Sequence, residues 1–194
     1  MARMQMPSPL RYDLMLWLAA RGREAAFRDR QLDLARVTSG ESVLDVGCGT
    51  GTLALAAARR VASVHGLDPS AALLARARKK ARRAGLGVVF ELGTGESLPY
   101  PDESFDVVLS SFVLHHLSHD ALHDSARELR RVVKATGRVF IVDTGHGAVH
   151  GGGFDLEAMA PRLAAVGLHA IESGPVDFPL RGIGPVHYVL ASVA

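Results

Sequence analysis

Residues 43–51 read Val-Leu-Asp-Val-Gly-Cys-Gly-Thr-Gly, and this stretch decides the fold. It joins a short apolar strand, expected over residues 42–46, to a helix expected over residues 52–60. Glycines at alternate positions let the backbone turn sharply and let a ligand approach with no Cβ in the way. The helix that follows presents free N–H groups, which suit an anion or a carboxylate. The stretch is therefore expected to be a ligand-binding turn.

The spacing of the glycines discriminates between ligands. It is G-x-G-x-G, whereas the dinucleotide fingerprint is G-x-G-x-x-G, and position 52 is threonine. Asp68 follows a second expected strand, residues 61–67, at a place where a carboxylate can accept hydrogen bonds from both ribose hydroxyls. The plainer alternative is a tight structural turn with a capping aspartate, and the register of loop and aspartate weighs against it. A nicotinamide-dependent oxidoreductase stays a minor alternative.

Strands and helices alternate on both sides of this turn. The pattern indicates an α/β fold, with a doubly wound, Rossmann-like sheet of parallel strands and helices on both faces. Such sheets bind ligands at the carboxyl ends of their strands. Two last strands can form an antiparallel pair at one edge. Beyond the elements named above, we expect strands at 87–92, 105–111, 137–143, 168–174 and 186–193, and helices at 10–20, 23–37, 70–84 (with Ser70 as N-cap), 119–133 and within 155–166.

The loop and Asp68 together resemble the class I S-adenosylmethionine-dependent methyltransferases, in particular the small-molecule, type 11-like branch. The resemblance covers residues 42–193. It implies a seven-stranded sheet, mostly parallel with an antiparallel last strand, and S-adenosyl-L-methionine as the cofactor. By the same resemblance, the loop cradles the methionine part of the cofactor and the end of the second strand holds the ribose. The implied contacts are Asp45, Gly47, Cys48, Gly49, Thr50, Gly51, Asp68 and Pro69.

Residues 93–99 continue the resemblance at the adenine position. The family usually has an aspartate where Thr94 stands, and a threonine hydroxyl can still accept a hydrogen bond without carrying charge. We therefore expect weaker or differently arranged adenine binding. Gly95 and Glu96 fit the pattern and are expected to line the pocket, although Glu96 could equally be a surface residue. Ser110, in the fourth strand, completes the implied cofactor contacts.

Two histidines after the fourth strand are the candidate general bases. The sulfonium already activates the methyl group, so alignment supplies much of the catalysis. A base is needed only if the acceptor must lose a proton. His115 and His116 lie where a neutral imidazole could take that proton, and plain packing or solvent exposure is the alternative for each. His119 and His123 share a helical spacing that can bind zinc, but with no cysteine near them we expect no metal.

Other side chains could complete the site from outside these motifs. Tyr12 and Trp17, on the first helix, could close over the cofactor, and ordinary packing is the alternative. His146 and His150 lie in a glycine-rich loop after the fifth strand and could touch the acceptor. The turn at 135–137 reads Ala-Thr-Gly where the family has Pro-Gly-Gly, and we expect no effect on the chemistry.

A length of 194 residues fits one structural domain. We expect residues 1–40 to form a helical segment that packs on or caps the active site, and residues 41–194 to form the cofactor-binding domain. No large insertion follows the fourth or fifth strand. The acceptor pocket is therefore open, completed by the first helix, or completed by a second subunit in a homodimer.

Composition narrows the partners and the compartment. A net charge of +2 is small for a nucleic-acid binder of this size, and the basic run at 76–83 is expected to be the solvated face of a helix. The single cysteine excludes an intrachain disulfide, and no apolar run approaches the length that spans a bilayer. With no leader at its start, the chain is expected in the cytoplasm.

The sequence thus predicts an enzyme that transfers a methyl group from S-adenosylmethionine to a small-molecule acceptor by in-line displacement. A protein that binds S-adenosylmethionine or S-adenosylhomocysteine without catalysis is the main alternative, because Thr94 alters the adenine position. An RNA methyltransferase is less favoured, since residues 110–113 read Ser-Ser-Phe-Val and not an Asn-Pro-Pro-Tyr-like motif. Neither the acceptor nor its attacking atom follows from the sequence.

Overall fold

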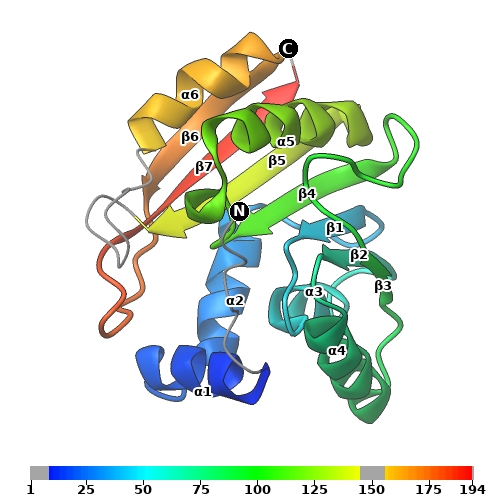
Figure 1. Cartoon of the computed structure of the whole chain (residues 1–194), viewed down its shortest axis with the longest axis vertical. Helices are drawn as coiled ribbons and strands as arrows, with labels where there is room; N and C mark the ends of the chain where they lie inside the picture. Colours follow the sequence, from blue (N-terminus) through cyan, green and yellow to red (C-terminus); the bar gives the residue numbers. More distant parts are fainter. Residues whose placement is uncertain (1–8, 145–155, 194) are drawn as a thin grey trace.

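The computed structural model describes residues 9–144 and 156–193, which form a seven-stranded sheet with helices on both faces (Figure 1). The strands are β1 (Ser42–Val46), β2 (Ser63–Asp68), β3 (Val89–Leu92), β4 (Phe105–Ser111), β5 (Val133–Thr144), β6 (Leu168–Pro175) and β7 (Val186–Val193). The helices are α1 (Pro9–Ala19), α2 (Glu24–Leu34), α3 (Thr52–Ala57), α4 (Ala71–Ala84), the short 3₁₀ turn η1 (Leu114–His116), α5 (His119–Val132) and α6 (Leu156–Ala165).

The order of the strands confirms the doubly wound topology. It is β3-β2-β1-β4-β5-β7-β6, in which the first five pair in parallel and β7 runs antiparallel to both β5 and β6. The chain moves outward from β1 to β3 and then returns to place β4 on the other side of β1. This reversal sets the carboxyl ends of β1 and β4 side by side, at the point where open α/β sheets bind ligands.

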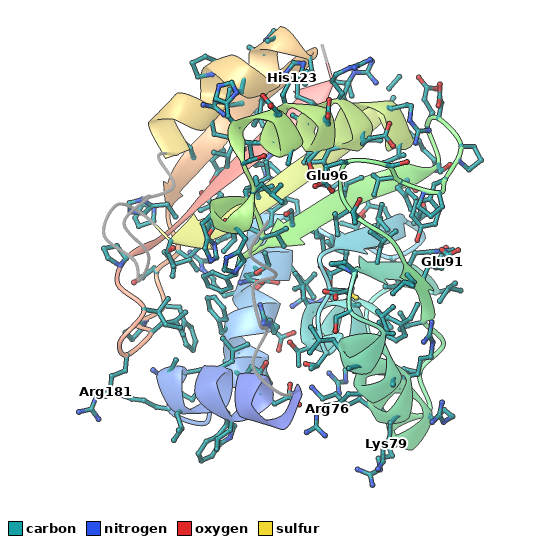
Figure 2. The ribbon with its side chains drawn as sticks, in the orientation of Figure 1. Arg76, Lys79, Glu91, Glu96, His123 and Arg181 are labelled. Atoms are coloured by element: carbon teal, nitrogen blue, oxygen red, sulfur yellow. The ribbon has the colours of Figure 1, made fainter. Side chains whose placement is uncertain are left out.

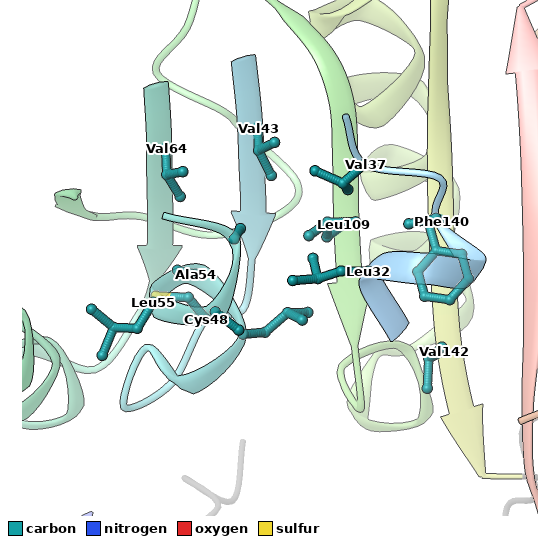
Figure 3. Close-up of a cluster of buried hydrophobic side chains, with 14 of the residues drawn as sticks. Leu32, Val37, Val43, Cys48, Ala54, Leu55, Val64, Leu109, Phe140 and Val142 are labelled. Carbon is teal, nitrogen blue, oxygen red and sulfur yellow. The ribbon is translucent and has the colours of Figure 1, made fainter. Parts of the chain in front are cut away.

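Each face of the sheet buries its own apolar cluster. On one face, α2, α3 and α4 cover side chains that include Val43, Leu109 and Phe140 (Figure 3). On the other face, α5 and α6 cover Leu44 and Val108. Alternation along β1 sends Val43 to the first cluster and Leu44 to the second. Burial on both faces explains why the strands read as continuous apolar runs in the sequence.

The expected turn at residues 135–137 lies inside a strand. β5 begins at Val133, directly after α5 ends, and the pairing with β4 changes register there. Phe105 opposes Val133, but Val107 opposes Arg138, so β5 carries extra residues between these two pairs. The prediction of a turn was wrong because a bulge absorbs these residues without breaking the strand.

Element ends elsewhere follow local backbone chemistry. The expected helix over 23–37 stops at Leu34 because Arg36 has a φ of 55° and the N–H of Val37 bonds back to the carbonyl of Leu32, at 3.0 Å. Ser70 caps α4 as expected, since its hydroxyl accepts from the N–H of Leu73 at 3.3 Å.

Over the described ranges, the helices fall short of the length and apolarity that crossing a bilayer requires.

Asp106 ties three strands together. Its Oδ2 accepts from the backbone N–H and the hydroxyl of Ser42 on β1, at 2.9 and 2.7 Å. Both carboxylate oxygens accept from Lys134 Nζ on β5, at 2.9 and 2.8 Å. Partial burial alone would raise the pKa of Asp106, but the hydrogen bonds from Lys134 and Ser42 outweigh it and lower that pKa to about 2.

Replacement of Asp106 should therefore weaken folding in a pH-dependent way. A carboxyl whose pKa is lower in the folded than in the unfolded chain stabilises the fold above the unfolded pKa, and this contribution is lost as pH falls through the folded pKa. Near neutral pH, we expect Asp106→Asn to lower the free energy of unfolding by about 1–2 kcal/mol. Urea denaturation should show the difference from wild type shrinking below about pH 4.

Asp102→Asn is the matched control, because its side chain is 75% exposed and pairs with Arg131 at the surface. We expect that variant to change stability by less than about 0.5 kcal/mol at any of these pH values. A loss in Asp106→Asn that does not depend on pH would contradict the role assigned to its charge.

Candidate cofactor and acceptor site

The glycine loop after β1 uses backbone conformations that glycine adopts without strain. Gly47, Gly49 and Gly51 have φ values of 74°, 56° and 78°. A Cβ at Gly47 would lie 2.3 Å from Cγ2 of Val113, and one at Gly51 would lie 2.9 Å from Cβ of Ala77. The loop is therefore packed between the segment that follows β4 and the helix α4, and it has no room for larger residues.

The end of β2 holds this loop in place. The carbonyl of Leu67 accepts from the N–H groups of Gly47 and Cys48, at 2.8 and 2.9 Å. The buried carboxylate of Asp68 accepts from Gly49 N–H at Oδ2 and from Ser70 N–H at Oδ1, both at 2.8 Å. Burial raises the pKa of Asp68 against these two bonds. Each carboxylate oxygen keeps a lone pair, so Asp68 can still accept from ligand hydroxyls.

Two predicted contacts turn their side chains into the fold. Asp45 is buried, and its Oδ2 accepts from Ala54 N–H of α3 at 3.1 Å. Burial raises the pKa of Asp45 to about 7, although the positive charge of Arg28 acts in the opposite direction. The thiol of Cys48 points into the apolar cluster (Figure 3), and burial raises its pKa as well. Their contact with a cofactor stays a prediction.

Most N–H groups of the loop are already used within the protein. In addition to the bonds made by Gly47, Cys48 and Gly49, the N–H of Gly51 donates to the carbonyl of Cys48 at 2.8 Å. The bond from Ala54 to Asp45 occupies a further donor at the start of α3, where the sequence led us to expect free N–H groups. A diphosphate requires several convergent N–H donors, so this loop suits a dinucleotide poorly.

The segment before β1 supplies a buried cation that the sequence reasoning missed. Arg28 of α2 is 4% exposed, and its Nε donates to Thr52 Oγ1 at 3.2 Å. Its Nη1 donates to Gln31 Oε1 at 3.3 Å and to Ser111 Oγ at 3.2 Å. The carboxylate of Glu24 lies 3.9 Å from Nη2, and Gln31 Nε2 is buried with no partner among the described residues. The guanidinium of Arg28, whose counter-charge on Glu24 is 3.9 Å away, and the amide nitrogen of Gln31 are donors that suit an incoming carboxylate.

The chain reverses after β4 and brings His115 to the end of β5. Phe112 has a φ of 59°, which costs about 1 kcal/mol for a non-glycine residue, and its N–H donates to the carbonyl of Val142 at 2.9 Å. His115 Nδ1 then lies 2.6 Å from Oδ1 of Asp143, which is fully buried. The ring centroid of His116 lies 3.7 Å from that of His115, the two rings are tilted by 49°, and His116 is exposed. The structure thus gives His115 a buried carboxylate partner, and a catalytic role for either histidine stays a prediction.

Three further predicted contacts lie near the carboxyl ends of β3 and β4. Thr94 is exposed and forms an isolated bridge with Ser97. Gly95 lies close to α5, since a Cβ there would lie 3.0 Å from Oγ of Ser125, a tight contact. Ser110 is buried, and its hydroxyl has no partner among the described residues. These positions fit a ligand at this edge, and their contacts with it stay predictions.

Glu96 is half-buried and Trp17 is exposed, and the contact of each with a cofactor stays a prediction. Glu96 lines a surface hollow of about 520 Å³, together with residues of α5 and of the end of α6 (Figure 2). Trp17 is 51% exposed and packs against Gly22. The other residues of the hollow are His123, Asp124, Arg127, Glu128, Arg130, Arg131, Ala165 and Val166.

Several predictions fall on residues whose side chains are not described. Tyr12 belongs to α1, but its side chain lies outside the described ones, and His146 and His150 lie outside the described residues. Pro69, next to the buried Asp68, is exposed. Within residues 9–144 and 156–193, the histidine, cysteine and acidic side chains form no group of three placed to hold a metal ion.

Asp13 ties the first helix to the glycine loop. Its Oδ1 accepts from Thr50 Oγ1 at 2.5 Å and from Lys80 Nζ at 2.8 Å, and its other oxygen bonds to Arg76. Burial opposes ionisation, but hydrogen bonds from Lys80, Thr50 and Arg76 lower the pKa of Asp13. We had expected the basic run on α4 to be a solvated face, and this expectation is wrong in part. Two of its cations pair with Asp13, while Lys79 projects away (Figure 2).

Comparisons with known proteins agree with this geometry. Residues 43–137 match a family described as methyltransferase domain. An uncharacterized methyltransferase of Bacillus subtilis, YcgJ, is 39% identical over 102 residues, which are 52% of this chain and 40% of that protein. A demethylmenaquinone methyltransferase of Thermus thermophilus is 36% identical over 135 residues, which are 69% of this chain and 60% of that protein. The matches thus span about half the length of these relatives.

Solved structures share the whole fold. A SAM-dependent methyltransferase from Aquifex aeolicus superimposes with a TM-score of 0.77, covering 97% of this chain and all of that one. At 20% sequence identity, this comparison shows the shared fold alone. The shared fold includes residues outside the matched range 43–137.

Removal of the Asp13 carboxylate should loosen α1. In Asp13→Asn, the cations Arg76 and Lys80 lose their shared partner, and we expect docking of α1 to weaken by about 1–2 kcal/mol. Hydrogen exchange of amides in α1 should then be about tenfold faster or more, with exchange in β4 unchanged.

Asp33→Asn serves as a control on the neighbouring helix α2, because Asp33 is also paired, with Arg60 at 2.6 Å, but is 58% exposed. It should leave exchange in α1 unchanged. Unaltered exchange in α1 of Asp13→Asn would show that apolar packing alone holds this helix.

Proposed function

This chain carries a methyltransferase domain of the class I S-adenosylmethionine-dependent kind over residues 43–137, and from this premise we propose that it transfers the methyl group of S-adenosylmethionine to a small-molecule acceptor. The observation that carries the proposal is the bonding of Asp68 to the glycine loop. The carboxylate that would hold the ribose and the loop that would hold the methionine are joined by a hydrogen bond of 2.8 Å and form one unit.

The residues present fit this cofactor. Asp68 offers free lone pairs to hydroxyls, and the loop leaves few N–H donors for phosphates. Ser110 Oγ and Gln31 Nε2 are buried polar atoms that lack partners among the described residues, at a place where such atoms are costly unless a ligand satisfies them. When bound, the cofactor supplies a methyl group that its positively charged sulfur already activates.

We assign the carboxylate of the cofactor to Arg28 and Gln31. Arg28 reaches the start of α3 through Thr52 and the end of β4 through Ser111, so its guanidinium lies between the two loops that meet at the switch point. This assignment gives the segment before β1 a role in binding, in agreement with the expected capping function of residues 1–40. The carboxylate of Glu24 lies as far as 3.9 Å from Nη2, so an anionic ligand would add a closer counter-charge to this buried guanidinium.

The relatives indicate where to begin with the acceptor. Several carry the name demethylmenaquinone methyltransferase, including the one from Thermus thermophilus. We therefore propose a hydroxylated aromatic ring, such as a naphthohydroquinone, as the first acceptor to test. Non-catalytic binding of the cofactor is the alternative outcome, favoured by the neutral and exposed Thr94 at the adenine position.

Titration with S-adenosylhomocysteine tests the cofactor site directly. We expect saturable binding to the wild type by calorimetry, and about 10- to 100-fold weaker binding to Asp68→Asn, which loses the charge that two hydroxyls would meet. Asp124→Asn, on the exposed side of α5, should bind as the wild type does. Failure of the wild type to bind at millimolar ligand would overturn the proposal.

A pair of ligands tests the assignment to Arg28. Arg28→Gln should bind S-adenosylhomocysteine about tenfold or more weakly, while its affinity for methylthioadenosine, which lacks the amino acid carboxylate, should change by less than about twofold. Arg23→Gln, which removes an equal charge from a cation stacked on Phe178, is the control. Equal weakening of both ligands by Arg28→Gln would mean that Arg28 supports the loop and does not meet the carboxylate.

A further inference from the structure

We propose that Asp143 is a positioning residue that fixes His115 as a general base, and that the acceptor is consequently one that gives up a proton, such as a phenol or an enol. The inference rests on the proposed methyl transfer and adds to it the residue that acts and the chemical class of the acceptor. It starts from one contact, since Nδ1 of His115 lies 2.6 Å from Oδ1 of Asp143.

Asp143 is held so that it can orient a partner. It lies near the end of β5, is fully buried, and accepts from the N–H of Thr144 at Oδ1, at 2.8 Å. Its Oδ2 accepts from the backbone N–H of His115 at 3.2 Å. Two backbone donors thus fix the plane of the carboxylate before the imidazole is considered. A buried carboxylate that binds both the backbone and the ring of one residue positions that ring tightly.

This contact selects the tautomer of His115. A carboxylate accepts hydrogen bonds, so Nδ1 must carry the proton that lies between the two groups. Nε2 of the neutral ring is then left with its lone pair. The side chain of His115 is 22% exposed, so the ring is partly accessible although Asp143 is not. A general base requires these features, namely a fixed ring, an available lone pair and access to the acceptor.

The local backbone adds evidence that the arrangement is built for this purpose. β4 could continue straight outward, but Phe112 adopts a left-handed conformation and η1 follows at once, which returns the chain toward β5. Strain of this kind is kept where the surroundings enforce it, commonly at functional sites. Its consequence here is that His115, from the end of β4, and Asp143, from the end of β5, meet on the ligand-binding edge of the sheet.

The proton balance of the step follows from this arrangement. An acceptor oxygen or carbon uses an electron pair to form the bond to the methyl carbon, while the carbon–sulfur bond breaks and its electron pair stays on sulfur. The acceptor's proton passes to Nε2 of His115, and Asp143 stabilises the imidazolium that results. The proton is later released to water. No oxidant or further reactant is needed.

The first test uses the ligand-free protein. Heteronuclear NMR of the imidazole nitrogens should show His115 protonated at Nδ1 in the neutral ring, and Asp143→Asn should abolish this preference. His169→Gln, at an exposed site on β6, is the control and should leave the signals of His115 unchanged. A wild-type ring protonated at Nε2, or signals that do not respond to Asp143→Asn, would overturn the proposal.

The second test separates binding from proton transfer. With naphthohydroquinone as acceptor, we expect His115→Gln to lower kcat about 100-fold or more and Asp143→Asn about tenfold or more. KM and the affinity for S-adenosylhomocysteine should stay within about twofold of wild type, because neither side chain is assigned to the cofactor. A merely structural role of Asp143 would instead raise KM or weaken cofactor binding.

The possible failures remain distinguishable. If the wild type does not bind S-adenosylhomocysteine, the proposed function fails. If it binds but methylates only dimethyl selenide, which has no acidic proton to lose, the assignment of a protic acceptor fails while methyl transfer stands. A wild-type protein that binds S-adenosylhomocysteine but methylates neither acceptor also counts against the inference. Full methyltransferase activity of His115→Gln does so as well.

Discussion

The hydrogen bonds between the glycine loop and the end of β2 are the constraint on which the rest of the structure depends. The carbonyl of Leu67 and the carboxylate of Asp68 together take up the N–H groups of Gly47, Cys48 and Gly49. They join the exits of two neighbouring parallel strands, so the loop cannot move independently of the sheet. Because most of the loop's own N–H groups are consumed in this way, few donors remain for a phosphate group.

The switch point then places two kinds of chemistry next to each other. The proposed cofactor contacts lie mainly at the ends of β1 and β2, whereas His115 lies in η1 after β4 and Asp143 lies near the end of β5. The pairing of β4 with β5 aligns Ser111 with Val142, so the turn after β4 emerges beside the end of β5. The strand order therefore brings the proposed cofactor contacts and the proposed base to one edge of the sheet.

The helices before β1 contribute charges to this edge and not only apolar cover. Arg28 bridges the start of α3 and the end of β4 through Thr52 and Ser111, and Asp13 joins Thr50 to the basic side chains of α4. In both cases a partly or fully buried ion needs a partner from a different element, since desolvation is costly for an unpaired charge. The first helix therefore contacts the glycine loop through Thr50, and the second contacts the start of α3 through Thr52.

The sequence by itself determined the fold class and the position of the cofactor loop, because local patterns encode both: apolar runs for buried strands, glycines at left-handed positions, and an acidic residue after the second strand. Only the tertiary structure decided that a buried carboxylate contacts the ring of His115, and that Arg28 lies buried at the loop. Asp143 is 28 residues from His115 in sequence, and Arg28 is 83 from Ser111. No local period links such pairs, since their proximity arises from strand order and register, and these are set by packing of the whole sheet.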